Sequence, residues 1–242
     1  MLDETIVRVK VSGDFACFTR PDLKVERMTY PCMTPSAARG VLDSILWKPE
    51  FQWYIRRILV LNPVKFFSIK RNEINAKQGK SPLIIEERRT QRNSIILRDV
   101  SYIIEASIYQ QQFDGTNPPV KYVEMFKRRI RKGQCYRRPF LGTREFAAEF
   151  SEVVHSEKPI QDTIPIGSML FDIFYDETGK PSPLYFYDVA VVEGVLNCHV
   201  PENDTMMTSS HIQPAMDSEI SAVLYNFNQR EDEEARLEVK HD

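Results

Sequence analysis

The order of elements along the sequence predicts an α+β fold built on one antiparallel sheet. Runs that alternate between apolar and polar residues, or are rich in β-branched residues, indicate strands. Two runs with helical spacing interrupt them, and the resulting order is β-α-β-β-α-β. With both helices on one face of the sheet, this order is the ferredoxin-like (RRM-like) one. A hairpin insertion and a small antiparallel β-sheet domain after it complete the predicted architecture.

The first predicted elements are a strand over residues 5–11 and a helix that follows Thr34. Thr34 is a favoured N-cap, and Pro35 suits the first helical position, where its missing N–H costs nothing. Pro49 is expected to end the helix. One apolar stripe runs along it: Ala38, Val41, Leu42 and Ile45.

The central elements are predicted strands over residues 51–61, 64–69 and 95–109. The polar residues 71–94 lie between the last two strands. They are expected to form either a mobile insertion or a long hairpin, because they offer little to a core.

A second helix is predicted over residues 120–132, with Gly133 closing it. A last strand is expected over 143–153. The inward-facing side chains of the helix are expected to be Val120, Val123, Phe126 and Ile130. The outward-facing ones are Lys127, Arg128, Arg131 and Lys132.

The chain is expected to divide into three parts. Residues 1–155 form the ferredoxin-like domain, and 156–225 form a small β-rich domain with strands near 168–175 and 184–195. Residues 226–242 are highly charged and nearly free of large apolar residues, so a flexible acidic tail is expected there.

Charge is distributed unevenly over the 242 residues, although the formal net charge is only −2. Residues 1–150 contain 27 Lys and Arg against 16 Asp and Glu, whereas residues 151–242 contain 5 against 18. This polarity favours a basic surface for a polyanion. The alternative is two ordinary solvated surfaces of opposite sign.

Several classes of protein are disfavoured by what the sequence lacks. No apolar run is long enough to span a membrane, and the acidic start does not resemble a secretory signal, so a cytoplasmic protein is expected. The four cysteines are scattered, as expected for buried or free thiols. The four histidines have no metal-ligand spacing, and no phosphate-binding glycine loop or nucleophile elbow occurs, so neither metal nor cofactor is expected.

The segment of residues 121–146, KYVEMFKRRIRKGQCYRRPFLGTREF, holds nine basic residues against two acidic ones. Arg and Lys neutralise phosphates, and aromatic rings such as those of Tyr122, Tyr136 and Phe140 can stack on unpaired bases. Gly142 lacks a side chain, which would let RNA approach the backbone. We interpret the segment as an RNA-binding surface, against the alternative of a solvated helix followed by a simple turn.

Several stretches resemble those of a known family. They are YPCMTPSAARGVLDSILWKPEFQW, IKRNEI, KYVEMFKRR and KGQCYRRPFLGTREF, and the resemblance covers about residues 5–150. The chain is similar to the subtype I-C CRISPR-associated RAMP endoribonucleases, the fifth Cas protein family. This resemblance implies a RAMP domain that cleaves CRISPR precursor RNA at the repeat hairpin. It also implies that the 5′ handle is kept and that other subunits of the type I-C interference complex are partners.

The resemblance also implies a metal-independent reaction in which the ribose 2′-OH attacks the adjacent phosphate. The family site is similar to a Tyr–Lys–His set, in which Lys121 stands at the lysine. Tyr122 replaces the histidine and Leu46 replaces the tyrosine. Tyr30, Tyr54 and Tyr136 are other sources of a hydroxyl. The predicted catalytic residues are therefore Lys121 and Tyr122.

The predicted RNA-binding residues are Arg39, Lys127, Arg128, Arg131, Arg137, Arg138, Gly142 and Arg144. Some side chains have a second interpretation. Lys121 could be a plain phosphate contact, Tyr122 a core residue or a stacking platform, and Arg39 part of an interior ion pair.

Three functions are compatible with these observations. The leading hypothesis is the endoribonuclease, and the second is a subunit that binds the crRNA 5′ handle without cutting. The third is a ferredoxin-like protein without a nucleic-acid role.

Overall fold

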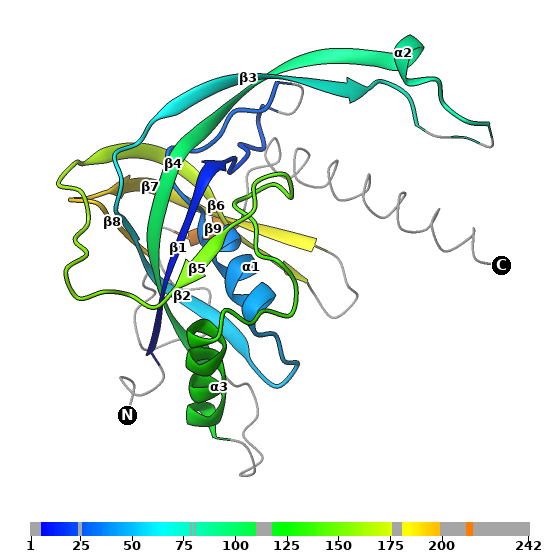
Figure 1. The fold of residues 1–242 in the computed structure, drawn as a ribbon. Helices are drawn as coiled ribbons and strands as arrows, with labels where there is room; N and C mark the ends of the chain where they lie inside the picture. The colour runs from blue at the N-terminus through cyan, green and yellow to red at the C-terminus, as the bar shows by residue number, and fades with distance from the viewer. Residues whose placement is uncertain are drawn as a thin grey trace.

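The main sheet consists of five strands in a row and a sixth beside them. The computed structural model describes residues 6–23, 26–77, 79, 81–109, 118–175, 181–198 and 212–214. The row follows the order β5-β1-β4-β2-β8, and its neighbours are antiparallel (Figure 1). The strands are β1 (Ile6–Ala16), β2 (Gln52–Val60), β4 (Arg89–Tyr109), β5 (Glu149–Ser151) and β8 (Val195–Asn197).

One face of this sheet carries the core. The buried side chains of β1 alternate along the strand, and Val9 opposes Ile104 of β4 across the ladder. The helices α1 (Pro35–Ile45) and α3 (Pro119–Arg131) add their apolar stripes to the same buried cluster, including Leu42 and Phe126. The sheet and two helices therefore form two layers around one core.

Helix α1 begins as the sequence predicts but ends early. Thr34 Oγ accepts a hydrogen bond from Ala37 N–H at 3.1 Å, and Pro35 is the first helical residue. The expectation that the helix continues to Pro49 is wrong. Leu46 adopts an extended conformation and is fully buried, while its carbonyl accepts a hydrogen bond from Trp53 Nε1 at 2.9 Å. Packing of Leu46 and capping by Trp53 thus end the helix at Ile45, before Pro49.

The polar residues after residue 70 form a long hairpin arm. β3 (Phe66–Ile74) pairs with the first half of β4, from Phe66 opposite Leu97 to Ile74 opposite Arg89. The short helix α2 (Ile85–Arg88) lies near the tip of the arm, which projects from the body (Figure 1). Of the two predicted alternatives, the hairpin is therefore the one observed.

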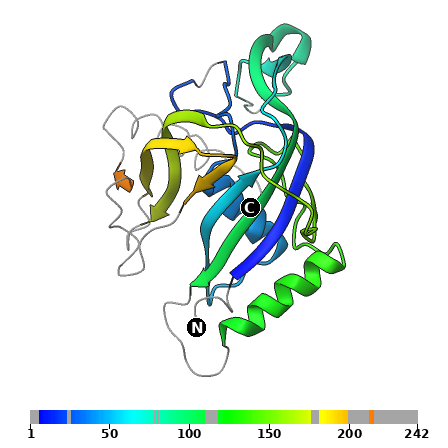
Figure 2. The same cartoon turned by 90° about the vertical axis from the view of Figure 1, so that its left-hand side faces the viewer.

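A second, smaller sheet has the order β6-β7-β9. It consists of β6 (Ile164–Tyr175), β7 (Pro181–Val191) and β9 (Ile212–Pro214), and it lies beside the main sheet on the side away from α3 (Figure 2). Met169 and Phe186 belong to the same buried cluster as Leu42. The two sheets therefore share one continuous core.

Other predicted elements differ from the structure in extent. The strand expected over 143–153 is reduced to the three residues of β5, because the residues before it form a turn-rich loop. The strand expected over 184–195 begins earlier and ends at Val191. The predicted acidic tail, 226–242, lies outside the described residues. No helix in the described part of the chain is long and apolar enough to cross a membrane.

Candidate nucleic-acid interface

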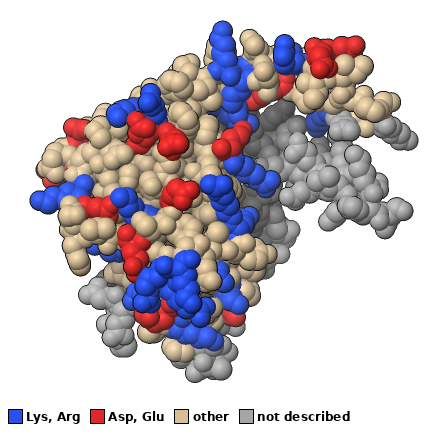
Figure 3. Space-filling view, in the orientation of Figure 1, with Lys and Arg blue, Asp and Glu red and all other residues tan. Residues whose placement is uncertain are grey.

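The amphipathic character of α3 produces the basic surface. Tyr122, Val123, Phe126 and Ile130 are buried, and the predicted outward positions are exposed. Val120, expected to face inward, is 44% exposed, and Tyr122 takes its place in the core. Basic side chains gather over α3 in Figure 3. The outward residues are Lys127, Arg128, Arg131 and Lys132.

Most of this positive charge is weakly neutralised. Lys127 pairs with Glu124 at 3.1 Å, and Arg131 pairs with Glu152 at 3.9 Å, both at exposed positions. Exposed ion pairs contribute about 0–1 kcal/mol, so a phosphate can displace them. Within the described part of the chain, no ion pair or side-chain hydrogen bond is made by Arg128, Lys132 or Arg144.

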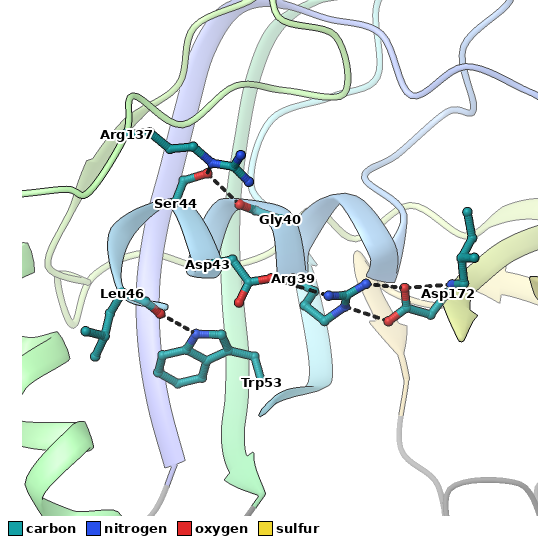
Figure 4. A network of polar contacts seen from close by, with 9 residues as sticks. Arg39, Gly40, Asp43, Ser44, Leu46, Trp53, Arg137 and Asp172 are labelled. Atoms are coloured by element: carbon teal, nitrogen blue, oxygen red, sulfur yellow. Dashed lines mark hydrogen bonds and ion pairs between the residues drawn. The ribbon is translucent and has the colours of Figure 1, made fainter. Parts of the chain in front are cut away.

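Two arginines of the basic segment hold the end of α1. Arg129 Nη1 donates a hydrogen bond to the carbonyl of Ile45. Arg137 Nε donates to Ser44 Oγ at 3.3 Å, and the backbone N–H of Arg137 donates to Ser44 O at 3.1 Å (Figure 4). We refer to Arg129, Arg137 and Ser44 as the α1 anchor. Cations at a helix C-terminus are favourable, because the last carbonyls lack partners within the helix.

Arg39 forms an ion pair that joins α1 to the second sheet. Its Nε and Nη2 donate to the two carboxylate oxygens of Asp172, each at 2.7 Å, and Nη1 lies 3.3 Å from Asp43 Oδ2 (Figure 4). Burial raises the pKa of the Asp43 carboxyl above its ordinary value, Asp172 raises it further, and Arg39 opposes the shift. Arg39 therefore makes the ion pair that its second interpretation predicts.

The three positions that correspond to the family's catalytic set lie in different environments. Lys121 is exposed in the first turn of α3, with Nζ 5.9 Å from the centre of the Tyr122 ring. Tyr122 is only 2% exposed, and its ring centre lies 4.9 Å from that of Phe51. Leu46 is fully buried. Burial does not favour the predicted role of Tyr122 in proton transfer and matches its core alternative.

Gly142 is required by a close backbone approach. Its φ is +85°, and a Cβ at this position would lie 2.0 Å from the carbonyl oxygen of Cys17. The adjacent Leu141 carbonyl accepts a hydrogen bond from Cys17 N–H at 3.0 Å. The predicted reason for the glycine, room for RNA, is wrong, because the backbone of Cys17 and Phe18, which follow β1, occupies that space.

The loop that carries Arg144 contacts the base of the hairpin arm. Its neighbour Glu145 accepts from Arg71 Nη1 on β3 at 2.9 Å and lies 3.9 Å from Arg27. Lys121, by contrast, lies at the start of α3, and about 17 Å of helix axis separates it from Lys132 at the other end. The predicted RNA-binding surface is therefore an elongated one along α3 and the loop after it.

Metal ligation has no support in the part of the chain that the structure describes. No group of three or more His, Cys, Asp and Glu side chains there is placed to hold an ion. Of the four histidines, His155 lies within the described residues and is exposed.

Comparison with known proteins identifies the class of this protein. The family model described as "CRISPR-associated protein (Cas_Cas5)" matches residues 6–181. A CRISPR pre-crRNA endoribonuclease Cas5d of Thermus thermophilus is 46% identical over 176 residues, which are 72% of this chain and 76% of that protein. A protein of the same name from Mannheimia succiniciproducens is 38% identical over 214 residues, covering 79% of this chain and 93% of the relative.

A solved structure has a related fold. The crystal structure of a CRISPR-associated protein superimposes with a TM-score of 0.61 at 22% identity, over 83% of this chain and 95% of that one. The comparisons thus place this chain among the CRISPR-associated proteins. Since the family model matches well over half of the residues, the chain belongs to the Cas5d family.

The sequence did not reveal the structural roles of the α1 anchor or of Asp172. The spacing of Arg39 and Asp43, four residues apart on one helix, signals an ion pair. Asp172 lies 133 positions from Arg39, and the contact depends on how the second sheet packs. Arg129 and Arg137 look the same in sequence as the outward arginines beside them.

Proposed function

We propose that this chain is a metal-independent endoribonuclease that cleaves CRISPR precursor RNA at the repeat hairpin and keeps the 5′ handle. The observation that carries the proposal is the identity of 46% and 38% with two relatives named CRISPR pre-crRNA endoribonuclease. The exposed cations along α3 provide the electrostatic surface that RNA requires. Its partners are the precursor RNA, the mature crRNA and the other subunits of the type I-C interference complex.

The proposed reaction is attack of a ribose 2′-OH on the adjacent phosphate. The 2′-oxygen forms a bond to phosphorus, the bond to the 5′-oxygen breaks, and the products carry a 2′,3′-cyclic phosphate and a 5′-OH. The proton of the 2′-OH leaves to a base, and the departing 5′-oxygen gains a proton. The exposed Lys121 ammonium stabilises the charge that builds up on the phosphate oxygens.

Proton transfer in this chain depends on groups other than those at the family's tyrosine and histidine positions. Leu46 has no proton to give, and the buried ring of Tyr122 packs against Phe51. In-line positioning and charge stabilisation by themselves accelerate the attack of the 2′-OH on the phosphate. Positioning by the basic surface and charge stabilisation by Lys121 are therefore proposed as the main sources of rate.

The finer description of the fold is part of this proposal. The order β5-β1-β4-β2 with antiparallel neighbours supports a ferredoxin-like RAMP domain within residues 1–155. The sheet of β6, β7 and β9 supports a small β-rich unit within 156–225.

A second function is favoured by one observation. Two of the three positions of the family's catalytic set are buried, at 2% exposure for Tyr122 and 0% for Leu46. A subunit that binds the 5′ handle without cutting needs the basic surface but not these groups.

Incubation with repeat-containing RNA in EDTA distinguishes the two functions. For the endoribonuclease we expect a product that ends in a cyclic phosphate. The Lys121→Ala substitution should slow cleavage by about 100-fold or more with little change in affinity, because it removes charge stabilisation from the transition state. Lys127→Ala, a matched lysine on the same helix, should slow cleavage far less. Tight binding with intact RNA would support the non-cleaving subunit instead.

A further inference from the structure

The turn that follows α3 is held firmly against α1. Gly133 N–H donates to Ile130 O at 3.1 Å, and Gln134 N–H donates to Arg129 O at 2.9 Å, so the chain reverses tightly. Tyr136 N–H donates to Ser44 O at 2.9 Å, beside the contacts of the α1 anchor. Ser44 is itself buried and donates to Gly40 O at 2.7 Å (Figure 4). The backbone on both sides of Tyr136 is therefore fixed.

The side chain of Tyr136 nevertheless extends into solvent. It is 78% exposed, more than any other large hydrophobic residue in the described part of the chain. Because the backbone is already fixed, binding to this ring does not carry the additional entropic cost of ordering the loop. Such a ring is suited to a flat, apolar ligand face.

The charge around Tyr136 favours a polyanion as that ligand. The sequence contains no acidic residue between Glu124 and Glu145, and eight basic residues occur in that interval. The neighbouring Arg138 is 72% exposed and pairs only weakly with Glu149, at 3.5 Å. A nucleotide supplies both an aromatic face and a phosphate, whereas an apolar protein partner would leave these cations uncompensated.

The hydroxyl of Tyr136 is not placed to take part in the reaction proposed at Lys121. Lys121 lies in the first turn of α3, about 17 Å along the helix axis from Lys132, and Tyr136 follows that far end of the helix. General acid or base groups must lie within hydrogen-bond reach of the reacting atoms. The ring of Tyr136, rather than its hydroxyl, is the functional part.

We propose that Tyr136 is a base-stacking platform, on which an unpaired nucleobase of the bound RNA rests while Arg138 contacts the neighbouring phosphate. This inference rests on the proposed function, since it assigns a binding site for the same RNA. It also extends the bound strand from Lys121 along the whole of α3. A strand that reaches both ends must place several nucleotides on the basic surface.

Three substitutions at one position test the role of the ring. Wild type, Tyr136→Phe, Tyr136→Leu and Tyr136→Ala are titrated into fluorescein-labelled repeat RNA, and anisotropy gives the Kd at several salt concentrations. Stacking is worth about 1–3 kcal/mol per base. Tyr136→Ala should therefore weaken binding by about 5- to 150-fold. Tyr136→Phe should bind within about twofold of wild type, and Tyr136→Leu should fall between Phe and Ala.

The salt dependence separates stacking from charge. Tyr136→Ala should leave the slope of log Kd against log salt unchanged, because no phosphate contact is lost. Arg138→Ala should reduce that slope by about 0.7, the value for one single-strand contact. Cleavage by Tyr136→Phe should match that of wild type.

Four outcomes would overturn the proposal. The first is wild-type affinity in Tyr136→Ala, and the second is equal affinity of Tyr136→Leu and Tyr136→Phe. The third is loss of cleavage in Tyr136→Phe. The fourth is a Tyr136→Ala variant that binds RNA normally but fails to assemble with the other subunits, which would assign the ring to a protein contact. A wild-type chain that binds no repeat RNA would overturn the proposed function as well. Wild-type binding with an unaffected Tyr136→Ala variant would overturn this inference only.

Discussion

Anchored and outward-facing residues alternate within the basic segment of residues 121–146, although they look alike in the sequence. Arg129 contacts a carbonyl at the end of α1, while its neighbour Arg128 has no side-chain partner in the described part of the chain. Gly142 touches the backbone of Cys17, while a Cβ at Gly133 would meet nothing within 4 Å.

This difference shows that one basic segment can both stabilise the fold and present cations to a ligand. The anchored residues fix the loop and the end of α1, so their loss should lower stability. The outward residues are solvated, so their loss should lower RNA affinity and leave stability unchanged. Substitution of neighbouring residues therefore separates folding from binding.

The largest effect is expected at Gly142. Gly142→Ala places a methyl group against the Cys17 carbonyl in a left-handed conformation, and we expect the free energy of unfolding to fall by more than about 3 kcal/mol. Gly133→Ala is the matched control, since its φ is also positive but the space around it is open, and it should cost about 1 kcal/mol. Urea denaturation measures both, and equal losses would contradict the account of the close approach.

A smaller effect is expected when the α1 anchor is broken. Arg129→Ala removes a charged donor from the Ile45 carbonyl, and we expect a loss of about 1–2 kcal/mol in the free energy of unfolding. Arg128→Ala should stay within about 0.5 kcal/mol of wild type. Thermal or chemical denaturation measures both variants. Should Arg128→Ala be the less stable of the two, the division into anchored and outward residues fails.

The outward residues are tested by salt. The double variant Arg128→Ala with Lys132→Ala removes two cations that have no side-chain partner among the described residues. The slope of log Kd against log salt should therefore fall by about 1.4 for single-stranded RNA. Replacing Lys65 and Arg98, which both approach Asp99, removes the same charge elsewhere and should reduce the slope less. Anisotropy with labelled repeat RNA measures both slopes. An equal reduction in the two variants would mean that net charge, not the surface of α3, sets the affinity.

The smallest effect is expected in the pH dependence of stability. Burial raises the pKa of Asp43 in the folded state, so the folded protein holds this proton more tightly than the unfolded chain. Its contribution to stability therefore falls as pH rises from about 4 through the raised pKa. Asp43→Asn lacks this group, so its stability relative to wild type should rise across that window in denaturation curves recorded between pH 4 and 7. A stability difference between Asp43→Asn and wild type that does not change with pH would show that the pKa of Asp43 is not raised.

The sequence predicted those features that depend on neighbouring residues. Helical spacing and the Thr34 cap predicted the start of α1, and helical spacing also predicted which basic side chains of α3 face outward. The same reasoning failed where a distant segment decides the outcome. Trp53 and the burial of Leu46 end α1 before Pro49.

The sequence predicted which cations of α3 face outward but not how the rest of the basic segment is arranged. Lys127, Arg128, Arg131 and Lys132 are exposed as expected. The sequence could not show that Arg137 donates to Ser44, since the contact spans 93 positions. Nor could it show that the loop after α3 reaches the base of the hairpin arm, because the contact between Glu145 and Arg71 spans 74 positions.

The capping of α1 by Arg129 and Arg137 has a consequence for the order in which the protein is made. The ribosome synthesises the residues of α1 long before those that complete its last turn, and at about 5–20 residues per second the interval is about 5–20 seconds. During this time the last carbonyl groups of α1 lack the donors that they have in the folded protein. The native end of α1 therefore forms late in synthesis, once the residues proposed to bind RNA have been made.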